Sequence, residues 1–121
     1  MSGKSILLVD DEVQFASTLA ERLELRGYEI RLAHNGRDAI DLTADRAPDV
    51  VILDVLMPGI GGLEVLRRIK KDLPELPVIL LTGRGNTSEA SEGIKLGAAD
   101  CLTKPISINE LIQKIRECTG D

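Results

Sequence analysis

The sequence predicts a single doubly wound α/β domain, in which five strand–helix units build a parallel β-sheet covered by helices. Two observations predict this fold class. Short apolar runs alternate with amphipathic stretches along all 121 residues, and no linker, repeat or low-complexity segment separates them. Three of the apolar runs are unbroken quartets, a pattern typical of parallel strands that are buried on both faces. We therefore expect one domain that spans residues 1–121.

The expected strands are the short apolar runs. In chain order they are residues 6–9, 28–32, 50–53, 78–81 and 99–102. The expected helices are the amphipathic stretches that follow them, at about residues 12–26, 36–46, 62–72, 87–96 and 108–118. Because each strand is followed by a helix, the connections should be right-handed crossovers.

Local signals mark several of the helix ends. Ser107 and Glu110 have the spacing of a capping box at the start of the last helix. Asn86 is a weaker candidate cap for the fourth helix. Gly27 and Gly97 stand where the first and fourth helices should end, because glycine adopts the left-handed conformation at little cost.

Composition excludes several classes of function. The chain has 20 acidic and 15 basic residues, a net charge of −5, and Phe15 and Tyr28 as its only aromatic residues. Direct nucleic-acid binding is not expected, since that function uses basic surfaces and stacking aromatics. No apolar run approaches the roughly 20 residues of a membrane span, so we expect no membrane insertion. The two cysteines and one histidine form no zinc motif, which favours reduced thiols and a cytoplasmic location.

Polar residues stand at the carboxyl ends of the expected strands. Asp10 and Asp11 follow the first strand, Asp54 follows the third and Thr82 follows the fourth. Lys104 lies just beyond the fifth. In an open parallel sheet, ligands bind in the crevice outside these strand ends. We therefore expect three carboxylates, a hydroxyl and an ammonium group to converge at one edge of the sheet.

Each of these residues also has an ordinary structural interpretation. An aspartate after the first strand can cap a helix, Asp54 can be a turn residue, and Thr82 and Lys104 can be a strand-end hydroxyl and a solvated lysine. Their joint placement favours a site, because clustered carboxylates repel one another unless a cation offsets their charge. Mg²⁺ prefers such oxygen ligands, and a remaining carboxylate can then attack a phosphoryl group. The cluster thus predicts Mg²⁺-dependent phosphoryl transfer to an aspartate.

Four motifs resemble those of the receiver domain of two-component response regulators. They are Leu-Val-Asp-Asp-Glu at 8–12, Leu-Asp-Val-Leu-Met-Pro-Gly at 53–59, Leu-Thr-Gly at 81–83 and Gly-Ala-Ala-Asp-Cys-Leu-Thr-Lys-Pro at 97–105. The resemblance covers essentially the whole chain, in order. It implies a flavodoxin-like fold with strand order 2-1-3-4-5. It also implies that Asp54 is the phospho-acceptor, Asp11 a direct Mg²⁺ ligand, Asp10 a largely water-mediated one, and the backbone carbonyl of Leu56 a further ligand.

The same resemblance implies how the phosphoryl group is held and where it comes from. Thr82 and Lys104 would contact its oxygens, and the bond between Lys104 and Pro105 would be cis. The donor would be the phosphohistidine of a sensor histidine kinase. The domain would catalyse its own phosphorylation and dephosphorylation without being an enzyme for other substrates. Phosphorylation would then change the surface formed by the fourth helix, fifth strand and fifth helix, for a downstream effector or a phosphorylation-dependent homodimer.

Partner docking and switching depend on less specific residues. Gln14, Phe15 and Thr18 on the first helix are candidates for docking the kinase or phosphotransferase, although Phe15 could instead pack over a neighbouring helix. Cys101 stands where the family commonly has an aromatic residue that changes rotamer, so a ring-flip switch is not expected. Leu56 and Arg84 occupy positions that in the family influence the lifetime of the phosphate.

Three other functions are less consistent with the sequence. An aspartate-nucleophile Mg²⁺ phosphohydrolase would place its nucleophile after the first strand and would need a cap or pocket for its substrate. A flavin electron carrier would need a hydroxyl-rich phosphate loop in place of Asp10 and Asp11. A phosphorylation-independent interaction module would be favoured by a degraded site. With no effector sequence after Asp121, we expect either a stand-alone receiver or one excised from a longer chain.

Overall fold

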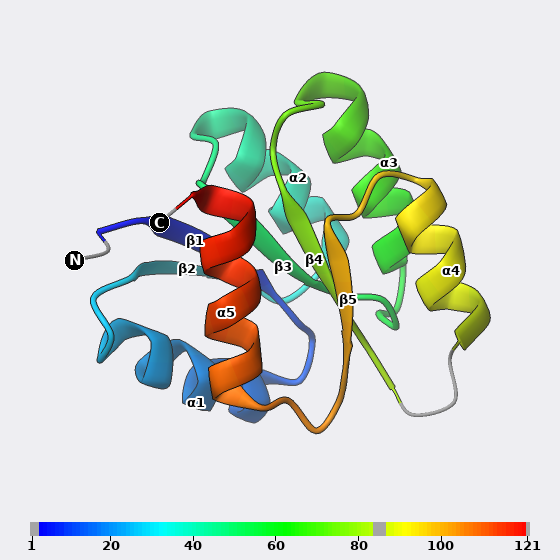
Figure 1. Ribbon diagram of the computed structural model, residues 1–121. Helices are drawn as coiled ribbons and strands as arrows, with labels where there is room; N and C mark the ends of the chain where they lie inside the picture. Colours follow the sequence, from blue (N-terminus) through cyan, green and yellow to red (C-terminus); the bar gives the residue numbers. More distant parts are fainter. Residues whose placement is uncertain (1–2, 84–86, 121) are drawn as a thin grey trace.

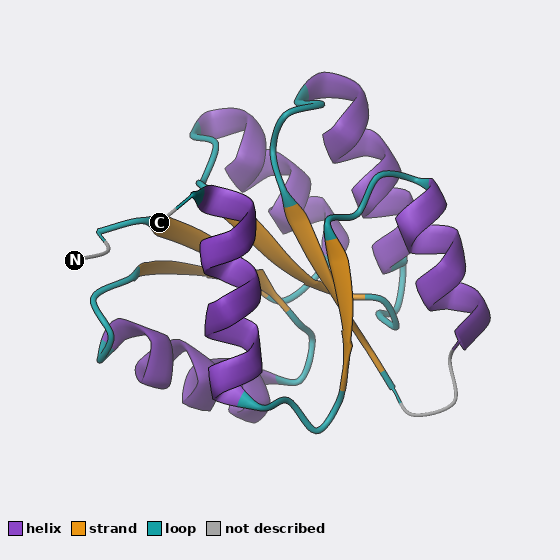
Figure 2. Ribbon diagram, in the orientation of Figure 1, coloured by secondary structure: helices purple, strands orange, loops and turns teal. Residues whose placement is uncertain are grey.

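The computed structural model describes residues 3–83 and 87–120 and confirms the predicted fold class. A five-stranded parallel sheet has the order β2-β1-β3-β4-β5, with helices on both of its faces (Figures 1 and 2). The strands are β1 (Ser5–Val9), β2 (Glu29–Ala33), β3 (Val50–Asp54), β4 (Val78–Thr82) and β5 (Asp100–Thr103). The helices are α1 (Val13–Glu24), α2 (Gly36–Asp45), α3 (Gly62–Asp72), α4 (Thr87–Lys95) and α5 (Ile108–Thr119).

The unbroken apolar runs are buried on both faces of the sheet, as their pattern predicts. Ile6 and Leu8 of β1 join a core cluster with α1 and α5, whereas Leu7 and Val9 join a second cluster with α2 and α3. Figure 1 shows α1 and α5 on one face and α2, α3 and α4 on the other. Because successive side chains of a strand point to opposite faces, a strand between two helical layers has no polar face.

The helix-end signals are confirmed where the structure describes them. The Ser107 hydroxyl accepts a hydrogen bond of 3.3 Å from the backbone N–H of Glu110. Gly27 and Gly97 follow α1 and α4 with φ of 92° and 106°, in the left-handed region. The candidate cap Asn86 lies outside the described residues. Among the described residues, no helix combines the length and apolar character needed to cross a membrane.

Candidate functional site

The candidate site lies at the carboxyl ends of β1 and β3, beside the loop that leads from β5 to α5. Asp10 follows β1 and is fully buried, while Asp54 is the last residue of β3 and is 5% exposed. Lys104 follows β5 directly, and the peptide bond between it and Pro105 is cis, as the sequence resemblance implies. Three segments that are far apart in the sequence therefore meet at one edge of the sheet.

The Lys104 ammonium lies among three carboxylates. Its Nζ donates to Asp10 Oδ2 at 2.9 Å and to Glu12 Oε1 at 2.7 Å, and it lies 3.7 Å from Asp54 Oδ2. The other oxygen of Asp10 accepts a hydrogen bond of 2.9 Å from the backbone N–H of Glu12, which holds the loop after β1 against the site. One cation thus offsets only part of the negative charge of these three acids.

The charge on Asp54 is disfavoured by its surroundings. Burial and the nearby Asp10 carboxylate raise its pKa from 3.8 to about 6, and Asp11 adds to the shift. Lys104 and a 3.3 Å hydrogen bond from the Leu56 backbone N–H act in the opposite direction. Burial by itself would lower the pKa of Lys104, but its hydrogen bonds to Glu12 and Asp10 outweigh that effect and raise it. Lys104 therefore remains a cation, and Asp54 binds a proton more tightly than a solvent-exposed aspartate does.

The acidic residues fit a hard divalent cation. Oxygen atoms of Asp10, Glu12 and Asp54 all lie within 4.8 Å of one another. Carboxylate oxygens are the ligands that Mg²⁺ selects, usually with retained water molecules. Asp11, which the sequence resemblance makes a direct ligand, is exposed at the rim and is not one of these three.

Of the other two predicted site residues, Leu56 contacts Asp54, whereas the Thr82 hydroxyl contacts β5. The buried Thr82 hydroxyl donates to the Leu102 carbonyl of β5 at 3.5 Å and accepts from the Cys101 thiol at 3.8 Å. Leu56 has an exposed side chain, and its backbone N–H contacts Asp54. Arg84, the candidate for an influence on phosphate lifetime, lies outside the described residues.

Sequence reasoning missed two contacts of the site. Glu12 belongs to the acidic motif, and its position directly after the two aspartates was the signal that could have identified it. Phe15 places its ring centroid 4.4 Å from the Lys104 ammonium. The Cys101 side chain is half-buried, and this burial raises the pKa of its thiol, which keeps it protonated.

A groove beside the site contains two of the predicted docking residues. Its lining comes from α1 and from the segment that follows Lys104, namely Phe15, Thr18, Leu19, Arg22, Pro105, Ile106 and Ile108, and it encloses about 220 Å³. Phe15 also packs against the core cluster between α1 and α5. Both interpretations of Phe15 from the sequence are therefore compatible with its position.

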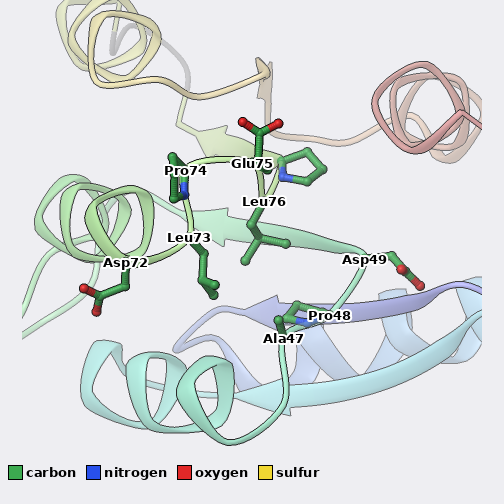
Figure 3. Close-up of a pocket in the computed structure, with 9 residues that line it drawn as sticks. Ala47, Pro48, Asp49, Asp72, Leu73, Pro74, Glu75 and Leu76 are labelled. Atoms are coloured by element: carbon green, nitrogen blue, oxygen red, sulfur yellow. The ribbon is translucent and has the colours of Figure 1, made fainter.

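A second pocket lies away from the acids. It encloses about 370 Å³ and is formed by the loops that precede β3 and β4 (Figure 3). Its acidic lining residues, Asp49, Asp72 and Glu75, are separate from the cluster around Asp54. The amino ends of parallel strands lie at the opposite edge of the sheet from the carboxyl ends, so this pocket does not contribute to the candidate site.

Comparison with curated proteins finds response regulators. The chain is 44% identical over 116 residues to the "uncharacterized transcriptional regulatory protein YkoG" of Bacillus subtilis, covering 96% of this chain and 51% of that protein. It is 40% identical over 118 residues to the phosphate regulon transcriptional regulatory protein PhoB of Pseudomonas aeruginosa, covering 96% and 52%. The chain thus spans about half the length of these relatives.

Solved structures give the same result at the level of the single domain. The receiver domain of NtrX from Brucella abortus superposes with a TM-score of 0.91 and 38% identity, covering 95% of this chain and 98% of that one. A response regulator receiver domain protein from Clostridium thermocellum superposes with a TM-score of 0.93 and 33% identity, covering 97% and 94%. The family model of the response regulator receiver domain matches residues 6–116. This chain therefore belongs to the receiver domain family of two-component response regulators.

Proposed function

We propose that Asp54 accepts a phosphoryl group from the phosphohistidine of a sensor histidine kinase, and that the domain itself catalyses both this transfer and the later hydrolysis. The observation that carries the proposal is the position of Asp54, a buried strand-end carboxylate beside the Lys104 ammonium, which also pairs with Asp10. Such a carboxylate is shielded from bulk water and lies next to a fixed positive charge.

The transfer is a displacement at phosphorus. An Oδ atom of ionised Asp54 forms a bond to the phosphorus while the P–N bond of phosphohistidine breaks, and the imidazole leaves with the electron pair. The Lys104 ammonium, 3.7 Å from Asp54 Oδ2, lies close enough to neutralise negative charge on the phosphoryl oxygens. Thr82 would turn from the Leu102 carbonyl to donate to one of these oxygens. In the hydrolysis, water attacks the same phosphorus, the P–O bond to Asp54 breaks, and inorganic phosphate leaves, which returns the Asp54 carboxylate.

Mg²⁺ would supply positive charge that holds the phosphoryl oxygens and Asp54 together. We propose Asp10, Asp11, Asp54 and the Leu56 carbonyl as the residues that hold it. Glu12 is a further candidate ligand, because its carboxylate oxygen lies within 4.8 Å of oxygens of Asp10 and Asp54. Glu12 also accepts a hydrogen bond from the Lys104 ammonium.

The decisive experiment measures the intact mass of the protein after incubation with Mg²⁺ and acetyl phosphate. We expect the wild type to gain one phosphoryl group and Asp54→Ala to gain none. Asp72→Ala is the matched control, because it removes an exposed aspartate of the remote pocket and should label like the wild type. An unlabelled wild type, or equal labelling of Asp54→Ala, would contradict the proposal.

We also propose a surface of this domain for each kind of partner. The kinase would dock on the α1 face that includes Gln14, Phe15 and Thr18, next to the groove beside the site. The effector, or a second copy of the chain, would bind the surface of α4, β5 and α5. Since both curated relatives are named as transcriptional regulatory proteins, gene regulation is the output that we propose for the protein carrying this domain.

The phosphohydrolase alternative is not favoured. Its nucleophile would follow β1, whereas the carboxylate with the raised pKa is Asp54 at the end of β3. Sustained release of phosphate from sugar phosphates by the wild type would reopen that alternative.

A further inference from the structure

Lys104 contacts an aromatic ring as well as carboxylates. The Phe15 ring centroid lies 4.4 Å from Nζ, within the range of a cation–π interaction. We propose that Phe15 is a positioning residue for the reaction at Asp54, acting through the face of its ring to hold the Lys104 ammonium at the phosphoryl site. This inference rests on the proposed function, because it assigns Phe15 a role in that same reaction.

The ring is fixed by its packing. Phe15 is half-buried and packs against the core cluster shared by α1 and α5. It also lines a groove with Pro105 and Ile106, which follow Lys104 in the chain. A ring held by the core cannot follow a mobile ammonium, so it restricts where the ammonium can go. This matters for lysine, whose four-carbon side chain is flexible and loses much conformational entropy when it is confined.

The ring holds the charge of Lys104 without occupying its donors. An ammonium group has three N–H donors, and Asp10 and Glu12 accept two hydrogen bonds from Nζ. A phosphoryl oxygen on Asp54 needs at least one donor, and Asp54 Oδ2 already lies 3.7 Å away. The Phe15 ring attracts the cation through its quadrupole and accepts no conventional hydrogen bond. It can therefore stabilise the ammonium both before and after Lys104 turns toward the phosphoryl group.

Positioning and docking by Phe15 have different consequences for labelling. A residue that only docks the kinase affects transfer from the kinase and leaves labelling by a small phosphodonor intact. A residue that positions Lys104 affects both reactions, because both use the same ammonium. Labelling by acetyl phosphate in the presence of Mg²⁺ is thus the informative measurement.

We expect Phe15→Leu to lower the initial rate of labelling by acetyl phosphate about fivefold, the change that corresponds to a partly desolvated cation–π contact. Phe15→Tyr keeps an aromatic face and should restore a rate close to that of the wild type. Tyr28→Leu is the matched control. It replaces the other aromatic residue of the chain, which lies in the same core cluster, and should label like the wild type although its stability falls.

Nuclear magnetic resonance gives a readout that a purely structural role would not change. A ring 4.4 Å from Nζ should shift the ε-methylene protons of Lys104 upfield. We expect the shift in the wild type and in Phe15→Tyr and its loss in Phe15→Leu, with Lys104→Arg identifying the resonance.

Three results would overturn the inference: equal labelling rates for Phe15→Leu and the wild type, equal slowing by Tyr28→Leu, or an unshifted Lys104 resonance in the wild type. With a normally labelled wild type, these results leave the proposed function intact. A wild type that fails to label would instead contradict the proposed function, and the inference with it.

Discussion

Asp54 is placed where its own charge destabilises the fold. Burial and Asp10 raise its pKa to about 6, so the folded protein binds a proton at Asp54 more tightly than the unfolded chain does. Stability must then fall as the pH rises between 3.8 and about 6, because the unfolded state releases its proton first. The same gathering of carboxylates is what fits the cation that we propose for the site.

Asp54→Asn should relieve this cost in the absence of metal. In EDTA at pH 7 we expect its free energy of unfolding to exceed that of the wild type by about 2 kcal/mol, after allowance for solvent screening of the shift. The difference should shrink as the pH falls below about 6 and vanish below 3.8, where both states of the wild type are protonated. Urea unfolding at several pH values measures it. A constant difference across this pH range would show that the shift at Asp54 is not its cause.

Lys104 has the opposite effect, because it is the only described cation that contacts the buried Asp10. Removing one partner of a buried pair leaves an uncompensated charge. We expect Lys104→Met to lower the free energy of unfolding by about 2 kcal/mol in EDTA, and Mg²⁺ to restore part of it.

Asp11→Ala, which removes an exposed repelling carboxylate, should melt no lower than the wild type. Thermal melts with and without Mg²⁺ test both variants, and a clearly lower melting temperature for Asp11→Ala would mean that Asp11 is structural.

Among single residues, the sequence located those whose position follows from the strands. Asp10, Asp54 and Lys104 could be predicted because the carboxyl ends of parallel strands meet, whatever the details of packing. The Lys104 contacts with Glu12 and Phe15 could not, because they depend on the path of the loop after β1 and on the rotation of α1. The orientation of the Thr82 hydroxyl toward β5 depends in the same way on side-chain packing.

At the scale of elements, the start of α3 packs closely against the end of β3, where Asp54 lies. A Cβ on Gly62 would collide with the Asp54 carbonyl oxygen and would lie 2.6 Å from the Cα of Val55. The neighbouring Gly61 has a φ of −70°, and a Cβ at that position would meet no atom within 4 Å. Close packing of α3 against the end of β3 therefore requires a glycine at position 62 but not at position 61.

Gly62→Ala should accordingly destabilise the domain by about 1–3 kcal/mol, because rigid backbone must move to admit the methyl group. Labelling of Asp54 by acetyl phosphate should also slow, since the displaced backbone is that of Asp54 and Val55. Gly61→Ala is the matched control and should change the free energy of unfolding little. Denaturant unfolding of the two variants decides the point, and equal destabilisation would contradict the role of close packing.

The elements were predictable because each apolar run and each amphipathic stretch is buried according to its own pattern. The strands β3 and β4 run one residue further than expected, to Asp54 and Thr82, because neighbouring strands continue to pair with these polar residues. Asn35 also caps α2 by accepting from the Asp38 N–H at 2.8 Å, a cap that the apolar pattern did not indicate.

At the scale of the whole molecule, the site and the proposed output surface are linked through Thr82. Its hydroxyl contacts the Leu102 carbonyl and the Cys101 thiol of β5, and Thr82 pairs with Thr103 in the sheet. A phosphoryl group carries a charge of about −1.5 to −2 at pH 7 and replaces the single negative charge of the Asp54 carboxylate. Phosphorylation therefore makes the chain, whose net charge is −5, more negative by about 0.5 to 1 unit. If the Thr82 hydroxyl turned toward the phosphoryl group, its contacts with β5 would break. The surface formed by α2 would not change.

Phosphorylation should therefore change amide hydrogen exchange most directly in β5, which contacts Thr82, and through β5 in α4 and α5. We expect altered protection in peptides covering residues 87–119 after treatment with Mg²⁺ and acetyl phosphate, and little change in β2 or α2. Asp54→Ala should show no change, because it cannot be labelled. Thr82→Ala should still accept a phosphoryl group but should lose most of the change in hydrogen exchange in β5. The contact that phosphorylation would break is the hydrogen bond from the Thr82 hydroxyl to the Leu102 carbonyl, which the variant lacks. If Thr82→Ala responded like the wild type, the signal would have to reach β5 by another route, through the backbone pairing of β4 with β5.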